Sequence, residues 1–296
     1  MTKPAAYRQA IDLARFIASF GVVAAHAYAM ENDWVGHISL GLFLILTAFL
    51  AMQSAQRAGG RYRFLVRAKR LVLPWLAWSL FFRLVALKVS DDPGKWQLLS
   101  DPWSLLVGST IHLWFLPFVM LAMALVEPVG RLITTPRRLA MALAALVVLS
   151  MPLFWAHELE LHAPLPQWSF GFPVYILGLL LGVAHPMGRA GWPLLAAAVL
   201  LGLGLLISGG AAWALTVVGA VLAFEVFWRM PMQGKWLPLL GQASFGIYLI
   251  HPFFMLVTYK FFGAEVNLLF AAVLTFAMSC AAVLVMRRVP ALARLI

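Results

Sequence analysis

Residues 38–56 read ISLGLFLILTAFLAMQSAQ and contain no charged side chain. A helix of this length rises about 28 Å, close to the thickness of the hydrocarbon core of a bilayer. The whole chain has the same character, because 63% of its 296 residues are hydrophobic and only 11% are charged. Its mean hydropathy is +0.91. A water-soluble core cannot bury so large an apolar fraction, so the composition predicts an integral membrane protein.

Ten apolar stretches of this kind follow one another along the chain, which predicts an all-α, polytopic membrane fold with about ten transmembrane helices. We expect these helices near 9–30, 38–56, 71–89, 104–129, 139–156, 170–186, 192–208, 211–228, 241–262 and 266–287. The sixth stretch is short and flanked by prolines, so a re-entrant segment is an alternative there. Every connection is short, and we therefore expect a single membrane domain over residues 1–296 with no appended soluble domain.

The basic residues are distributed unequally between the two sets of connections. Seventeen of the 22 Lys and Arg residues fall on the side of the two termini, whereas Lys88, Lys95 and Lys260 fall on the other side. By the positive-inside rule, both termini are predicted to be cytoplasmic. The net charge of +11 is then explained by topology and by attraction to membrane lipids, and we do not expect nucleic acid as a partner.

The first predicted span carries polar side chains on one face. Arg15 and His26 are eleven residues apart, which places them on the same side of a helix about 16 Å apart along its axis, and Asp12 lies close to the same stripe. Ionisable groups at membrane depth are costly and often functional. Asp12 and Arg15 are equally well explained as an interfacial ion pair, whereas we interpret His26, deep in the span, as a functional residue.

Two later spans add further candidates. Ser244, Tyr248 and His251 follow an i, i+4, i+7 pattern on one helix face, which fits either contact with a substrate or hydrogen bonding between helices. His112 and Trp114 lie near the start of the fourth span, where they can equally belong to the interfacial layer.

A basic loop joins the second and third spans. Arg63, Arg67 and Arg70 lie in it, and Arg side chains bind phosphate with two directed hydrogen bonds, so this loop is a candidate phosphate site. Cytoplasmic topology and anionic lipid explain most of its charge equally well. Cys280 is the only cysteine and no pair of histidines has zinc-like spacing, so we expect no metal.

Together these motifs resemble those of the acyltransferase family 3 membrane proteins. The matching elements are Arg15-x10-His26 preceded by Asp12, the glycine–aromatic stretch Gly41–Ala48, Arg67-Ala-Lys-Arg70, His112-Leu-Trp114-Phe-Leu, and Ser244-x-x-x-Tyr248-Leu-x-His251. The chain departs from the family at Thr47-Ala48, where Ser-Gly is usual.

The resemblance implies a membrane O-acetyltransferase that modifies a polysaccharide or similar acceptor. Its members move acyl groups, commonly acetyl from acetyl-CoA, onto hydroxyls of glycans or small molecules. The expected localisation is a bacterial cytoplasmic (inner) membrane. A transporter or flippase for a sugar or lipid-linked substrate, and a scaffolding membrane protein, are the alternatives.

The resemblance also suggests roles for the candidate residues. His26 would be the general base, with Arg15 and Asp12 beside it in the catalytic set. Phosphates of the acyl-CoA would be held by Arg67, Arg70 and Arg63. The acceptor or the oxyanion would be oriented by Ser244, Tyr248, His251, His112 and Trp114.

Overall fold

The computed structural model describes residues 8–28, 34–89 and 111–296, and these residues form helices joined by short connections, without a strand. Ten helical spans in the described part are long and apolar enough to cross a membrane, which confirms the predicted fold class. Nine of them are built on α1 (Ala10–Tyr28), α2 (Trp34–Arg57), α3 (Phe64–Val89), α7 (Pro136–Glu158), α8 (Leu165–Ala184), α9 (Gly191–Ser208), α10 (Leu215–Arg229, preceded by the 3₁₀ turn η4, Ala212–Ala214), α11 (Leu237–Phe262) and α12 (Leu268–Met286).

The fourth span is irregular. It consists of η2 (Ile111–Trp114), α5 (Phe115–Ala122), η3 (Met123–Leu125) and α6 (Val126–Leu132). The 3₁₀ turn η3 directly precedes the turn that contains Pro128, which has no N–H to donate to the carbonyl four residues earlier. Residues 104–110, where the sequence predicts the start of this span, lie outside the described residues.

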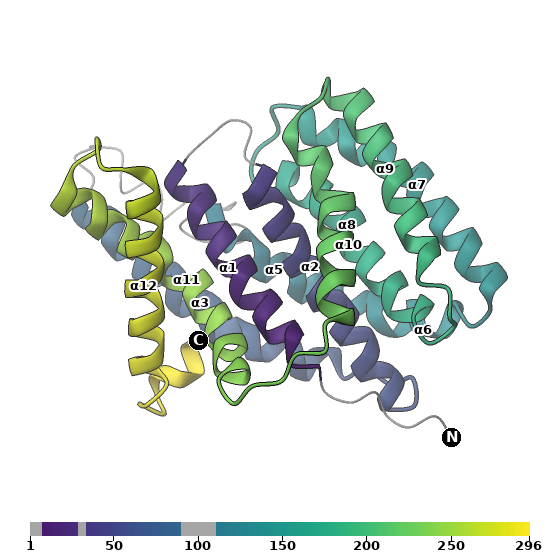
Figure 1. Cartoon of the computed structure of the whole chain (residues 1–296), viewed down its shortest axis with the longest axis horizontal. Helices are drawn as coiled ribbons and strands as arrows, with labels where there is room; N and C mark the ends of the chain where they lie inside the picture. The colour runs from purple at the N-terminus through teal and green to yellow at the C-terminus, as the bar shows by residue number, and fades with distance from the viewer. Residues whose placement is uncertain (1–7, 29–33, 90–110) are drawn as a thin grey trace.

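Helix α2 lies at the centre of the bundle and contacts α1, α6, α8 and α10 (Figure 1). Helix α2 packs closely against α8 because glycines of α8 place no side chain between the two helices. A Cβ atom at Gly178 would lie 2.8 Å from the Ile45 Cα, and one at Gly182 would lie 2.7 Å from the Met52 Cβ. Ala48 lies opposite Gly178. The glycine that allows close approach is therefore on α8, whereas the resembled family usually has one at the position of Ala48.

Helix α8 is the most enclosed span. Of its most apolar stretch of 18 residues, 78% is buried, compared with 22–28% of the corresponding stretches of α3, α7, α9 and α12, which form the outside of the bundle. Figure 1 shows α7 and α9 at one end of the long axis and α12 at the other. Since α8 is one continuous helix of 20 residues, the alternative of a re-entrant sixth segment is wrong.

One end of the bundle gathers the start of α1, the end of α10 and the start of α11, and we call it the basic end. There Gly234 N donates a hydrogen bond to Gln9 Oε1 (2.6 Å), and Arg287 donates to the Gln242 carbonyl oxygen (3.1 Å). The loop from Arg57 to Phe64 lies at the same end, because α2 runs antiparallel to α1. Which side of the membrane this end faces stays a prediction from the charge distribution.

Candidate active site

Three histidines and a tyrosine meet beside the middle of α11, away from the basic end, and we call them the histidine cluster: His26, His112, Tyr248 and His251. The His251 ring centroid lies 5.1 Å from that of His26 and 5.4 Å from that of His112. The Tyr248 ring is 5.8 Å from His112. The cluster therefore joins α1, η2 and α11, whose residues are more than 80 positions apart along the chain.

The members of the histidine cluster differ in exposure. His251 is 0% exposed and His112 5% exposed, whereas His26 is an exposed side chain. His26 lies in the last described turn of α1, two residues before Tyr28, and the expectation that it lies deep in its span stays a prediction. His26 is the member that a molecule outside the bundle can reach, and the other two rings lie behind it.

Hydrogen bonds fix the buried members. His112 Nε2 donates to the carbonyl oxygen of Leu249 (3.3 Å), and His251 Nδ1 donates to that of Tyr248 (2.8 Å). The Tyr248 hydroxyl donates to the carbonyl oxygen of His112. These bonds connect η2 to α11, so His112 is a buried member of the histidine cluster and not an exposed interfacial residue.

Aromatic side chains form the walls of the histidine cluster. Phe82 lies 5.1 Å from the His112 ring, and Phe115 lies 5.6 Å from the Tyr248 ring, measured between centroids. Such apolar surroundings strengthen each remaining polar interaction. Trp114, the neighbouring candidate, packs against Phe118 and Phe170 and is 5% exposed.

The structure does not bring all the candidates of α1 and α11 together. Asp12 is 5% exposed in the first turn of α1, where a Cβ atom at Gly241 would lie 2.2 Å from its Oδ1. Ser244 is buried and donates to the Leu240 carbonyl oxygen (2.9 Å) within its own helix. Arg15, one turn beyond Asp12, lies about 16 Å from His26 along the helix axis. These residues lie nearer the basic end and are not part of the histidine cluster.

The candidate phosphate-binding arginines lie at the basic end, around the start of α3. Arg63, Arg67 and Arg70 are exposed. Arg67 donates to Ser54 Oγ of α2 (2.6 Å) and its guanidinium lies 5.0 Å from the ring centroid of Tyr62. Burial raises the pKa of the Tyr62 phenol, and the Arg67 guanidinium acts in the opposite direction. Contacts with Ser54 and Tyr62 thus hold the Arg67 guanidinium in place.

Glu127 fixes the loop that carries these arginines. Its Oε2 accepts a hydrogen bond from Tyr62 N (3.0 Å), and its Oε1 pairs with Arg131. Because Tyr62 and Glu127 are 65 residues apart, helical spacing cannot predict this contact.

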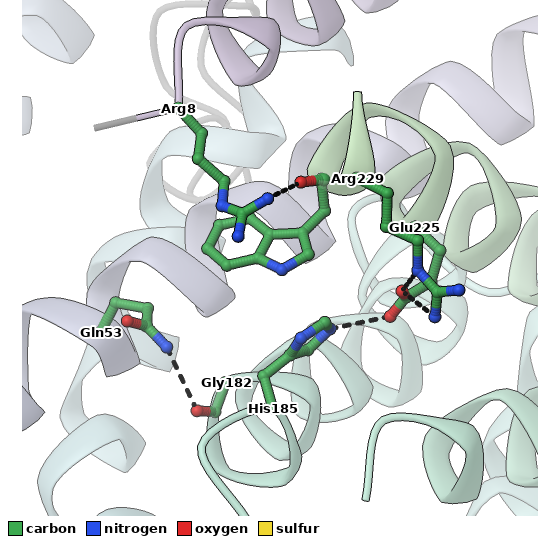
Figure 2. Close-up of polar contacts among 7 residues, drawn as sticks. Arg8, Gln53, Gly182, His185, Glu225 and Arg229 are labelled. Atoms are coloured by element: carbon green, nitrogen blue, oxygen red, sulfur yellow. Dashed lines mark hydrogen bonds and ion pairs between the residues drawn. The ribbon is translucent and has the colours of Figure 1, made fainter. Parts of the chain in front are cut away.

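A second polar group near the basic end links α8 to α10 (Figure 2). Glu225 lies between His185 Nε2 (2.8 Å from Oε1) and Arg229 (3.0 Å from Oε2), so it pairs with a residue of each helix. Next to it, Arg8 lies 4.3 Å from the Trp228 ring centroid and donates to the Trp228 carbonyl oxygen. The four ionisable side chains have partners within the protein, which indicates a structural role; they are Arg8, His185, Glu225 and Arg229.

Within residues 8–28, 34–89 and 111–296, no three His, Cys, Asp or Glu side chains converge in a way that could hold a metal ion. The histidine cluster can accept and release a proton, with the exposed imidazole of His26 in front of two buried imidazoles.

A comparison with protein-family models matches residues 8–287 to a model described as an acyltransferase domain. The match covers nearly the whole chain and includes every candidate residue above. A search of curated proteins and a search of solved structures each found no match.

Proposed function

Since the chain belongs to acyltransferase family 3 and is a membrane acyltransferase, we propose that it transfers an acetyl group from acetyl-CoA to a hydroxyl of a glycan or similar acceptor. The observation that carries this proposal is the histidine cluster, in which an exposed imidazole lies in front of two buried ones. We further propose that the protein resides in a bacterial cytoplasmic membrane with both termini inside.

The reaction assigned to the histidine cluster is direct transfer. The acceptor hydroxyl attacks the thioester carbonyl while His26 takes the hydroxyl proton. A bond from oxygen to the acyl carbon forms, the carbon–sulfur bond breaks, and CoA leaves as a thiolate that recovers the proton from His26. The exposure of His26 supports this assignment, because the acceptor must reach the base from outside the bundle.

The donor is proposed to enter at the basic end. Arg67 would hold a phosphate together with Arg63 and Arg70, and its contacts to Ser54 and Tyr62 support this role because they orient the guanidinium before binding. The acyl arm would follow α1 past Arg15 toward His26.

The remaining candidates are proposed to orient the acceptor and the oxyanion. His112 and Tyr248 support each other through the Tyr248 hydroxyl bond, so their contribution is to shape the site around His26. Ser244 and Trp114 are farther from the rings, and their proposed effect is on the position of α11 and of the fourth span.

A flippase or transporter is the alternative function. The family match favours transfer over transport, since the matched model describes an acyltransferase domain. A structural scaffold would not need the converging imidazoles of the histidine cluster.

Release of CoA thiol from acetyl-CoA by the purified protein tests the proposal. A positioned general base contributes about 10²–10⁴-fold to a rate, so His26→Ala should lower turnover by at least about 100-fold while the KM for acetyl-CoA stays unchanged. His162→Ala changes an exposed histidine in the connection between α7 and α8 and serves as the matched control. A folded His26→Ala protein with wild-type turnover would exclude His26 as the base.

A further inference from the structure

The buried ring of His251 lies directly behind the exposed ring of His26. The two ring centroids are 5.1 Å apart with an interplanar angle of 36°, and His251 is 0% exposed. The exposed ring meets the acceptor in the proposed function, whereas the buried ring has no access to a substrate outside the bundle. A role for His251 must therefore act through its neighbours.

The hydrogen bonds of α11 fix which nitrogen of His251 carries the proton. Nδ1 lies 2.8 Å from the carbonyl oxygen of Tyr248. A carbonyl oxygen only accepts hydrogen bonds, so Nδ1 must be the protonated nitrogen. In a neutral imidazole the other nitrogen, Nε2, then carries a lone pair and can only accept.

This accepting nitrogen has no partner in the described part of the chain. His251 Nε2 is buried and makes no hydrogen bond to any described residue. A buried acceptor left without a donor is costly, and such atoms are expected to have a purpose in a native structure. The other neighbouring imidazole, His112, uses its Nε2 proton on the Leu249 carbonyl oxygen.

We propose that His251 is a positioning residue for His26, and this inference rests on the proposed function. When His26 takes the proton of the acceptor hydroxyl, its ring becomes an imidazolium with N–H groups on both nitrogens. The Nε2 lone pair of His251 accepts a hydrogen bond from one of them. The proton stays on His26 until the CoA thiolate recovers it, so His251 stabilises the charged intermediate without changing its own protonation.

The apolar walls make this hydrogen bond valuable. Phe82 and Phe115 shield the buried side of the histidine cluster, where a positive charge has little water to solvate it. A hydrogen bond to a charged group is stronger than one between neutral groups. Its loss should lower the rate of the chemical step about 10- to 100-fold.

Two replacements of His251 separate this role from packing. His251→Asn keeps an amide donor near the position of Nδ1, where it can still reach the Tyr248 carbonyl oxygen, but has nothing at the position of Nε2. His251→Gln places its amide near the position of Nε2 and can accept there. If His251 positions His26, kcat falls about 10- to 100-fold in His251→Asn and recovers by about tenfold in His251→Gln. A purely structural role predicts the opposite order, because only the Asn variant keeps the bond to Tyr248.

The assay uses the full-length protein in detergent micelles, with acetyl-CoA as donor and water as acceptor, and measures free CoA thiol. Thermal unfolding of each variant shows whether it is folded. The KM for acetyl-CoA should not change in either His251 variant. His26→Ala combined with His251→Asn should be no slower than His26→Ala alone, because the two residues act as one unit.

The outcomes distinguish the inference from the proposed function. If the wild-type protein releases no CoA, the proposed function fails. If the wild type is active and His26→Ala is not, while folded His251→Asn keeps the wild-type kcat, only the positioning role is overturned. Equal losses in the Asn and Gln variants, with losses that multiply in the double variant, also overturn it.

Discussion

Replacing Gly178 by alanine should separate the two central helices. The new Cβ would lie 2.8 Å from the Ile45 Cα, 2.9 Å from the Ile45 carbonyl oxygen and 2.9 Å from the Ala48 Cβ. Two of these atoms belong to the backbone of α2 and cannot rotate away, so α2 and α8 must move apart. Overpacking of this kind costs about 1–3 kcal/mol.

Gly202 is the matched control for this substitution. It also lies inside a helix, α9, but a Cβ atom there meets nothing within 4 Å. Both changes gain about 0.5–1 kcal/mol from the higher helix propensity of alanine. The difference in unfolding free energy between Gly178→Ala and Gly202→Ala therefore isolates the steric cost and should be about 1–3 kcal/mol.

Unfolding of the two variants in detergent micelles, followed by circular dichroism against denaturant, measures this difference. Gly202→Ala should be at least as stable as the wild type and Gly178→Ala less stable. Equal stability of the two variants would refute the close contact between α2 and α8.

Three more predictions concern topology, donor binding and a buried hydroxyl. A reporter inserted after the second span should be cytoplasmic, and one inserted after the third span should be external. An external reporter after the second span would contradict the charge-based topology. Arg67→Ala should weaken CoA binding, measured by calorimetry, more than Arg57→Ala does, with a larger loss at low salt because screening is then weak; equal losses would indicate a diffuse basic patch. Tyr175→Phe should leave the unfolding free energy unchanged or raise it, because the buried Tyr175 hydroxyl has no partner in the described part of the chain. Tyr259→Phe removes a hydrogen bond to the Ala27 carbonyl oxygen (2.8 Å) and should lower the unfolding free energy by about 0.5–1.5 kcal/mol. The reverse order of stabilities would contradict this interpretation.

The number of spans could be predicted because the bilayer requires each span to be apolar by itself. Each span must be apolar over about 20 residues whatever its neighbours are, so hydropathy locates it without knowledge of the fold. The boundaries were less predictable. Helix α3 begins at Phe64 rather than near 71, since Arg67 and Arg70 belong to its exposed first turns although their charge lowers the local hydropathy.

The site was only partly predictable, because its parts meet through contacts between distant segments. The motif around His251 was identified, but its contacts with His26 and His112 depend on how α11 packs against α1 and η2. His185 was missed for the same reason, since its partner Glu225 is 40 residues away. Helical spacing predicts pairs such as Glu225 and Arg229 and contains no information about pairs between helices.

The packing of α1 has a consequence for the order in which the protein is made. This helix carries His26 and contacts α2, which follows it at once, but also α11 and α12, which are synthesised long after it. During synthesis α1 must therefore wait in the membrane, with one flank facing lipid, until α11 and α12 have been inserted. The histidine cluster is thus completed only after α11 has been inserted, and a chain that stops before Leu237 has Arg63, Arg67 and Arg70 but no assembled histidine cluster.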